Sequence, residues 1–178
     1  VFVNGQELTT HRCGYTAFRV EITEVAHPGE NLLAVKLDTT ENASIPPFGF
    51  VIDYLTYGGL YREAWLDIRS ESLIGDVYVT TPTTESVRIA VTTEKAQDCT
   101  CLAEILNEAG EVLLRERISD GVSEFAVPGA RKWSLNDPYR HTCRVTLCKG
   151  EAVVDEQNVK FGFRTAAFGK DHFFLNGE

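Results

Sequence analysis

The chain has 178 residues, of which 43% are hydrophobic and 24% are charged, so it is long enough for one large or two small globular domains. Its net charge is −9 and its lysines and arginines are scattered, which excludes the basic surface typical of nucleic-acid binding. No apolar run approaches the length of a membrane span, so we expect no membrane partner.

Five cysteines occur at irregular spacing: Cys13, Cys99, Cys101, Cys143 and Cys148. An odd number without a regular pattern argues against a disulfide framework. The last four could instead form a four-sulfur zinc site, but their spacings differ from the usual C-x2-C pairs. We favour free thiols, and therefore expect no metal ligand and a cytoplasmic location.

The first forty residues contain short alternating segments separated by turn residues. Residues 1–8 predict a hairpin with an Asn4-Gly5 turn. Residues 16–23 and 31–38 alternate apolar and polar side chains as strands do, and Pro28-Gly29-Glu30 predicts the turn between them. Short strands with regular turn signals favour a β-sandwich.

Residues 39–52 form a predicted loop that is broken by proline and glycine, and a strand pattern follows the pair Gly58-Gly59. From Leu60 to Ile68 the alternation places Arg62 on the same face as four apolar side chains. Because a buried charge needs a partner, we expect Arg62 to pair with a carboxylate.

After a polar linker at residues 70–72 the alternating pattern resumes. About seven strands are predicted, the number expected for an immunoglobulin-like sandwich, at residues 77–79, 87–91, 100–106, 112–118, 123–127, 144–147 and 153–161. Cys101 falls on the third of these strands rather than the second, so we do not predict the inter-sheet disulfide of antibody domains between Cys101 and Cys143.

Several motifs occur in a fixed order along almost the whole chain. They are Val1-Phe2-Val3-Asn4-Gly5, Gly14-Tyr15-Thr16-Ala17-Phe18, Asp53 with Tyr57-Gly58-Gly59-Leu60-Tyr61-Arg62-Glu63, Trp133 with Pro138-Tyr139, Phe161-Gly162-Phe163-Arg164, and Phe173-Phe174-Leu175-Asn176-Gly177. Together they resemble family 2 glycoside hydrolases, which include β-galactosidases, β-glucuronidases and β-mannosidases. The family usually continues Pro-Tyr-Leu-Tyr where this chain has Pro138-Tyr139-Arg140-His141.

The resemblance implies an all-β fold of two consecutive β-sandwiches within a fragment of a bacterial enzyme. Residues 1–70 would be the later part of a galactose-binding-like jelly roll, and residues 71–164 an immunoglobulin-like sandwich. Residues 165–178 would be the linker into a catalytic (β/α)8 barrel that the fragment lacks. The parent would be a retaining β-glycosidase of the β-galactosidase type, acting on β-linked saccharides.

The resemblance also implies that the catalytic glutamates lie on the barrel, so we assign no catalytic residue. Asp53 matches a family position that contacts the sugar, and its carboxylate is suited to accept hydrogen bonds from hydroxyl groups. The alternative is that Asp53 caps a turn. We expect no cofactor in the fragment, and the resemblance allows Mg2+ or Na+ in the parent.

Two functions remain open. The chain is either the non-catalytic front of a β-glycosidase, which supports its own barrel, or a free-standing carbohydrate-binding or protein-interaction module. An incomplete first sandwich would expose sheet edges and apolar side chains, which natural proteins avoid. We therefore expect chain pairing or domain swapping, and a homo-oligomer.

Overall fold

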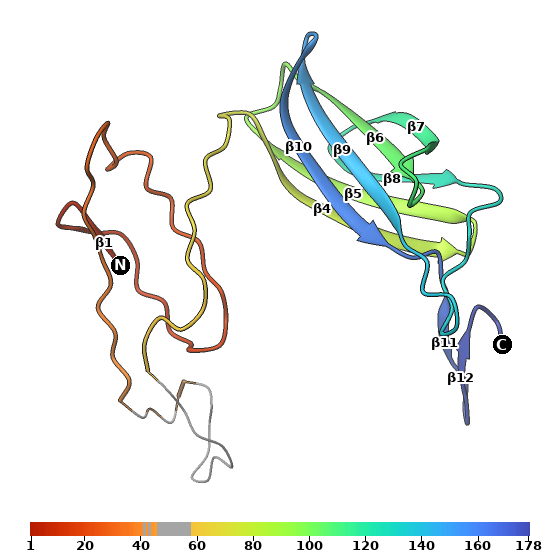
Figure 1. The fold of residues 1–178 in the computed structure, drawn as a ribbon, viewed down its shortest axis with the longest axis horizontal. Coiled ribbons are helices and arrows are strands. Elements are labelled where there is room, and N and C mark those ends of the chain that lie inside the picture. The colour runs from red at the N-terminus through yellow and green to blue at the C-terminus, as the bar shows by residue number, and fades with distance from the viewer. Residues whose placement is uncertain (41, 43, 46–57) are drawn as a thin grey trace. The chain divides into compact units, whose positions relative to one another are not determined.

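The computed structural model describes residues 1–40, 42, 44–45 and 58–178. The described residues form strands, turns and loops, so the predicted all-β class is confirmed. Two compact units, Val1–Leu66 and Asp67–Glu178, divide the chain (Figure 1). The described residues contain no helix long and apolar enough to cross a membrane.

The first unit contains three two-residue strands, β1 (Phe2–Val3), β2 (Gln6–Glu7) and β3 (Leu33–Ala34). Strand β1 pairs antiparallel with both of the others. The turn between β1 and β2 has positive φ angles of 51° at Asn4 and 85° at Gly5, as an Asn-Gly hairpin requires. The predicted hairpin is therefore confirmed.

The Asn4 side chain also joins this hairpin to residues far along the chain. Its amide donates hydrogen bonds to the Val25 carbonyl and the Asn31 side chain, both at 2.9 Å. Its carbonyl oxygen accepts a bond from the Leu32 N–H at 2.9 Å. One polar side chain therefore fixes the loop before β3 to the end of the hairpin.

The longer strands predicted for this unit are not formed in the structure. Residues 16–23 and 60–68 contain no strand, and the segment predicted at 31–38 is reduced to β3. A strand exists only when its N–H and C=O groups pair with a neighbour, and the described residues supply few such partners here. An alternating sequence is therefore not sufficient for a strand.

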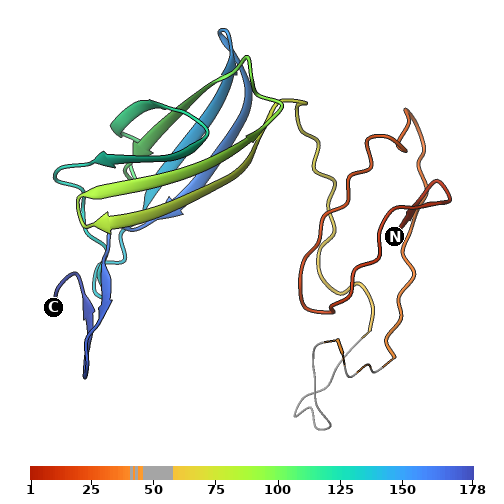
Figure 2. The same cartoon turned by 180° about the vertical axis from the view of Figure 1, so that it is seen from behind.

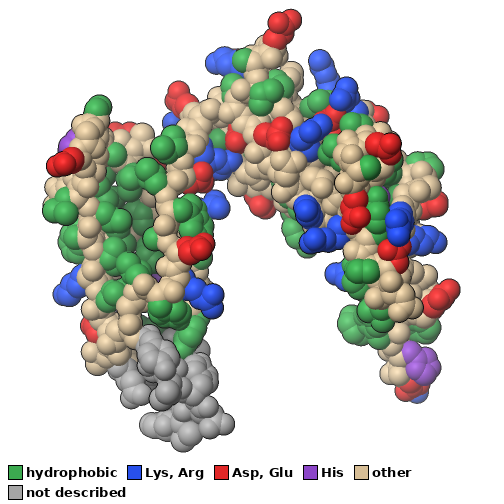
Figure 3. Space-filling model, in the orientation of Figure 1, with side chains coloured by type: hydrophobic (Ala, Val, Ile, Leu, Met, Phe, Trp, Pro, Cys, Tyr) green, Lys and Arg blue, Asp and Glu red, His purple; other side chains and the backbone are tan. Residues whose placement is uncertain are grey.

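Large hydrophobic side chains of the first unit are mostly exposed. Val3 is its one buried hydrophobic residue among those described. Trp65 is 71% exposed, Leu32 70% and Leu66 67%. Figure 3 shows hydrophobic side chains gathered on the visible face of this unit.

The second unit is a sandwich of seven antiparallel strands, the number predicted. They are β4 (Leu73–Thr83), β5 (Ser86–Glu94), β6 (Thr100–Leu106), β7 (Val112–Ile118), β8 (Gly121–Ala126), β9 (His141–Lys149) and β10 (Ala152–Phe161). One sheet has the order β10-β9-β6-β7 and the other β4-β5-β8. Figures 1 and 2 show the two sheets as the layers of one body.

The core lies between these sheets and follows the alternation of the sequence. Every second residue of the central strands points inward: Val87, Ile89 and Val91 on β5, Cys101, Ala103 and Ile105 on β6, and Cys143, Val145 and Leu147 on β9. Burial of a valine, leucine or isoleucine side chain stabilises the fold by roughly 1.5–3 kcal/mol. These buried side chains fix which face of each strand turns inward.

All five cysteines are free. Cys101 and Cys143 lie on neighbouring strands of one sheet, with Cys101 opposite Leu147 and Cys143 opposite Ile105. They do not occupy facing sheets, and β6 is the third strand of this unit.

The two ends of the second unit are tied to its sheets. Arg69 donates a hydrogen bond to Asp155 on β10 at 2.6 Å, and the Ser70 hydroxyl donates one to the Val154 carbonyl at 2.7 Å. The predicted polar linker at residues 70–72 is therefore attached to β10. Residues 165–178, predicted as a linker, form a hairpin of β11 (Ala166–Phe168) and β12 (Phe173–Leu175).

Candidate functional site

The predicted sugar-contacting residue, Asp53, lies outside the described residues, and so does Tyr57. The two glycines that follow are described. A Cβ atom on Gly58 would overlap the Thr39 side chain, and Gly59 has a φ of 121°. Only glycine meets both demands without strain, which explains the Gly-Gly pair of this motif. The substrate contact of Asp53 stays a prediction.

Arg62 does not lie on a buried face. Its side chain is exposed, as are Leu60 at 62% and Leu66 at 67%. Among the described residues no ion pair includes Arg62. The expected carboxylate partner is therefore not found among the described residues. An arginine that is exposed to water does not need one.

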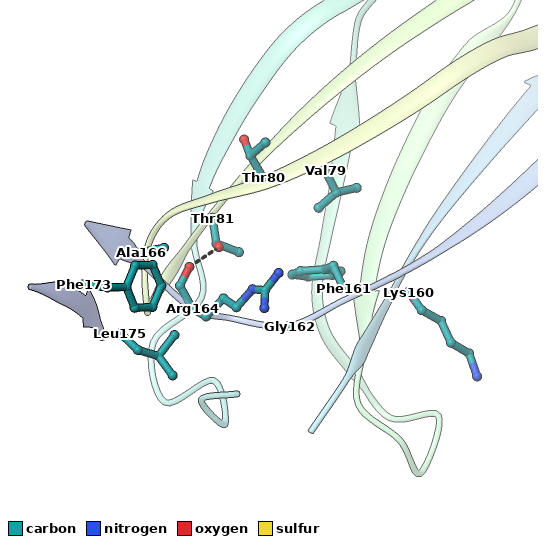
Figure 4. A pocket seen from close by; sticks show the side chains of 10 residues that line it. All are labelled: Val79, Thr80, Thr81, Lys160, Phe161, Gly162, Arg164, Ala166, Phe173 and Leu175. Carbon is teal, nitrogen blue, oxygen red and sulfur yellow. Dashed lines mark hydrogen bonds between the residues drawn. The ribbon is translucent and has the colours of Figure 1, made fainter. Parts of the chain in front are cut away.

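An open groove of about 530 Å³ lies at one end of the second unit (Figure 4). It is formed where β4, the end of β10 and the hairpin β11–β12 meet. Its walls are Val79, Thr80, Thr81, Lys160, Phe161, Gly162, Arg164, Ala166, Phe173 and Leu175. Two cations and two aromatic rings line it, together with two threonine hydroxyls.

Two motifs that are separated in the sequence meet behind this groove. The backbone N–H of Trp133 donates a hydrogen bond to the Phe163 carbonyl at 2.9 Å. The Arg164 guanidinium carbon lies 4.8 Å from the centre of the Trp133 ring, a cation–π contact. Trp133 thus packs against residues of its own unit.

The hairpin is fastened to the same place. The Asn176 amide donates a hydrogen bond to the Trp133 carbonyl at 3.0 Å, and its oxygen accepts one from the Thr165 N–H at 3.0 Å. The Thr81 hydroxyl donates to the Arg164 carbonyl at 2.6 Å, drawn dashed in Figure 4. The last motif of the resemblance therefore binds Trp133 and Thr165, the residue that follows the Phe161-Gly162-Phe163-Arg164 motif.

The corner at residues 131–139 has polar contacts of its own. Arg131 donates two hydrogen bonds to the Asp137 carboxylate, at 2.8 and 3.0 Å. Its guanidinium carbon also lies 4.4 Å from the centre of the Tyr139 ring. The Tyr139 hydroxyl accepts a bond from the Glu108 N–H at 3.0 Å, which ties the corner to the β6–β7 turn. We call residues 131–139, 161–165 and the hairpin the joint.

Sequence reasoning missed two polar residues of this unit. Glu104 is 3% exposed on β6 and binds Arg115 and Arg144, which lie opposite it on β7 and β9. His141 is 1% exposed at the start of β9. Opposite charges on three predicted strands could have indicated that Glu104 is paired. Only the register of those strands, however, brings Glu104 and the two arginines together.

The groove does not contain the groups that glycoside cleavage needs. A retaining glycosidase uses two carboxyl groups about 5–5.5 Å apart. No aspartate or glutamate is among the groove residues. Within the described ranges, no group of three or more histidine, cysteine or acidic side chains is placed to hold a metal ion.

The family model for glycosyl hydrolases family 2 matches residues 71–164, more than half of the chain. The chain therefore belongs to glycosyl hydrolases family 2, as the motifs indicate. The β-galactosidase of Thermoanaerobacter pseudethanolicus is 34% identical over all of this chain and 26% of its own length. The β-glucuronidase of Bacteroides fragilis is 28% identical over all of this chain and 29% of its own length.

Solved structures share the fold. A putative β-galactosidase from Bacteroides fragilis superposes with a TM-score of 0.80 at 25% identity, over 99% of this chain and 30% of that one. The β-glucuronidase of Bacteroides uniformis superposes with a TM-score of 0.82 at 24% identity, over 99% of this chain and 24% of that one. The chain thus spans between about a quarter and a third of these relatives.

Proposed function

We propose that this chain is the non-catalytic part of a retaining β-glycosidase that hydrolyses terminal β-linked sugars. The observation that carries the proposal is the coverage: the whole chain matches only 18–33% of the length of its relatives. The groove without carboxylates agrees with it. In this proposal the catalytic pair belongs to a (β/α)8 barrel elsewhere in the polypeptide.

We further propose a β-galactosidase-type substrate. Three β-galactosidases are 33–34% identical to this chain and a fourth is 25% identical, whereas the β-glucuronidases are 24–28% identical. Asp53 would accept hydrogen bonds from hydroxyl groups of the sugar. Any Mg2+ or Na+ requirement would belong to the parent. The five free thiols support a cytoplasmic location.

In the same proposal the joint supports the barrel. Phe168 is 88% exposed and Phe173 54%, and their ring centres are 5.2 Å apart at the end of the hairpin. Leu135, at the tip of the corner, is 80% exposed. Apolar groups presented on anchored elements suit contact with another surface. The barrel, or a second copy in a homo-oligomer, would cover them.

One observation favours a second function, that of a free-standing carbohydrate-binding module. Trp65 is 71% exposed and Tyr61 56% exposed in the first unit, and aromatic rings suit stacking against apolar faces of ligands. In that case the 178-residue chain would bind a β-linked polysaccharide by itself, and the substitution Trp65→Ala would abolish retention on it.

The test is an assay on aryl β-galactoside, β-glucuronide, β-mannoside and β-glucoside. We expect no turnover by the 178-residue chain and turnover of the galactoside by the longer gene product. Turnover by the chain that survives repurification would overturn the proposal, as would a longer product inactive on all four substrates. Within the longer product, Asp53→Asn should raise KM, and Asp67→Asn serves as the charge-matched control.

A further inference from the structure

His141 lies in a cage of aromatic rings at the point where the corner enters β9. Its ring centre is 4.9 Å from that of Tyr139, 4.9 Å from that of Phe163 and 5.9 Å from that of Phe161. The residue is 1% exposed. Among the described residues, its Nδ1 is the one buried side-chain nitrogen or oxygen without a hydrogen-bond partner.

Such an environment accepts the neutral imidazole and opposes the imidazolium ion. A buried charge requires hydrogen-bond partners or a counter-ion, and the cage supplies neither at Nδ1. We propose that His141 makes the joint sensitive to protons, so that the corner and the hairpin loosen together when the medium becomes mildly acidic.

The charged groups around the cage do not remove this conflict. Glu108, in the β6–β7 turn, attracts a proton to His141 but is itself exposed, so water screens it. Arg131 lies over Tyr139 and is neutralised by Asp137. On β10, Phe161 faces His141 in the strand register, next to Lys160. Burial is the dominant effect and lowers the pKa of His141 from its ordinary value of 6.5.

The sign of the effect follows from linkage. The unfolded corner binds a proton at pH values where the folded corner does not, so folding of the joint is fully favoured above pH 6.5. Below pH 6.5 each further pH unit raises the opening constant by up to about tenfold, until the folded histidine also titrates.

The opening would be transmitted by contacts already described. Tyr139 touches His141 and belongs to the corner that carries Trp133. Trp133 in turn accepts the hydrogen bond of Asn176 at the end of the hairpin. The hairpin therefore loses an anchor when the corner moves, and its exposed aromatic rings lose their fixed position.

Trp133 offers a direct probe once the other tryptophan, Trp65, is replaced. In the variant Trp65→Phe we expect a reversible change of Trp133 emission, with a midpoint below pH 6.5. Adding His141→Phe, which keeps an apolar ring in the cage, should abolish the transition. Adding His27→Gln, which changes an exposed histidine, should leave it unchanged. A transition that persists after His141→Phe is added, or that is missing in the Trp65→Phe variant itself, would overturn the proposal.

Two measurements on the wild-type chain decide the matter if His141→Phe does not fold. The imidazole NMR signal of His141 should titrate with a midpoint below 6.5. Amide exchange of residues 166–175, corrected for intrinsic rates, should accelerate between pH 7 and pH 5.5 more than that of β5. A midpoint at or above 6.5, or uniform exchange, contradicts the proposal. None of these readouts depends on glycosidase activity, so they stand apart from the test of the proposed function.

Discussion

Gly162 packs so closely against Trp133 that there is no room for a side chain at residue 162. A Cβ atom there would lie 2.8 Å from the Trp133 Cβ and 2.9 Å from its Cγ. Contacts this short do not occur between real side chains, and the Trp133 Cβ cannot move without its backbone. The glycine of the Phe-Gly-Phe-Arg motif is therefore fixed by packing against the corner.

The substitution Gly162→Ala should accordingly destabilise the second unit by about 1–3 kcal/mol, the usual cost of overpacking. Urea unfolding followed by circular dichroism measures it. Trp133→Gly, which also removes the Cβ atom, should remove the conflict, so that Gly162→Ala costs much less in that background. Equal costs in both backgrounds would show that Trp133 is not the obstacle. Gly14→Ala, where a Cβ atom meets nothing within 4 Å, is the control.

Glu104 provides a second prediction, because its carboxylate is 4% exposed and lies between two arginines. Arg115 donates from Nε to one oxygen at 2.6 Å and Arg144 from Nε to the other at 2.8 Å. Glu104→Gln should destabilise the second unit by about 2 kcal/mol, since hydrogen bonds to charged groups contribute about 1.5–3 kcal/mol each and both arginines keep access to water. Glu124→Gln removes the exposed pair with Arg88 and should cost less than about 1 kcal/mol. Equal costs for the two variants would contradict this account.

The same carboxylate should make the second unit sensitive to strong acid. Burial by itself would raise the pKa of Glu104, but hydrogen bonds from Arg144 and Arg115 outweigh it and hold the pKa below the ordinary value of 4.5. The stabilising contribution is therefore present above pH 4.5 and is lost as the pH falls below it. Urea unfolding between pH 6 and pH 3 should show a smaller loss of stability for Glu104→Gln than for the wild type. An equal loss of stability in the two proteins would exclude Glu104 as a cause of the acid sensitivity.

Three of the five thiols should differ in reactivity when native protein is alkylated. Burial raises the pKa of Cys143 to about 12 and that of Cys101 to about 11, and both are buried in the core. Cys13 has a lowered pKa, because the Tyr15 N–H and the Thr16 hydroxyl stabilise its thiolate. Iodoacetamide followed by peptide mass analysis should therefore modify Cys13 first, and Cys101 and Cys143 only after unfolding. Rapid modification of Cys143 in native protein would contradict the described core.

Asn176 allows the attachment of the hairpin to be tested separately. Its φ is 56°, so Asn176→Gly keeps the backbone conformation while it removes both side-chain hydrogen bonds. We expect amide exchange of β11 and β12 to accelerate by about tenfold, as the loss of roughly 1.4 kcal/mol implies. Exchange of β5 should not change. Asn158→Ala, which removes only a bond to nearby Glu156, should leave both regions unchanged.

The sequence by itself predicted the parts that depend on local pattern. The seven strands of the second unit follow from alternation with a period of two residues, and the Asn4-Gly5 hairpin follows from the φ angles that asparagine and glycine tolerate. The family motifs were readable because each is a short contiguous stretch. The strands predicted at residues 16–23 and 60–68 were wrong, since alternation does not supply a partner strand.

Only the tertiary structure decided which distant residues meet. The register of β6 with β7 and β9 brings Glu104 to two arginines that lie 11 and 40 residues away. The folding of the corner over the end of β10 turns three motifs into one joint and closes an aromatic cage around His141. Such contacts depend on strand pairing and side-chain packing across the whole unit. A single sequence records the residues but not their register, and for that reason it identified the family of the chain but not the joint.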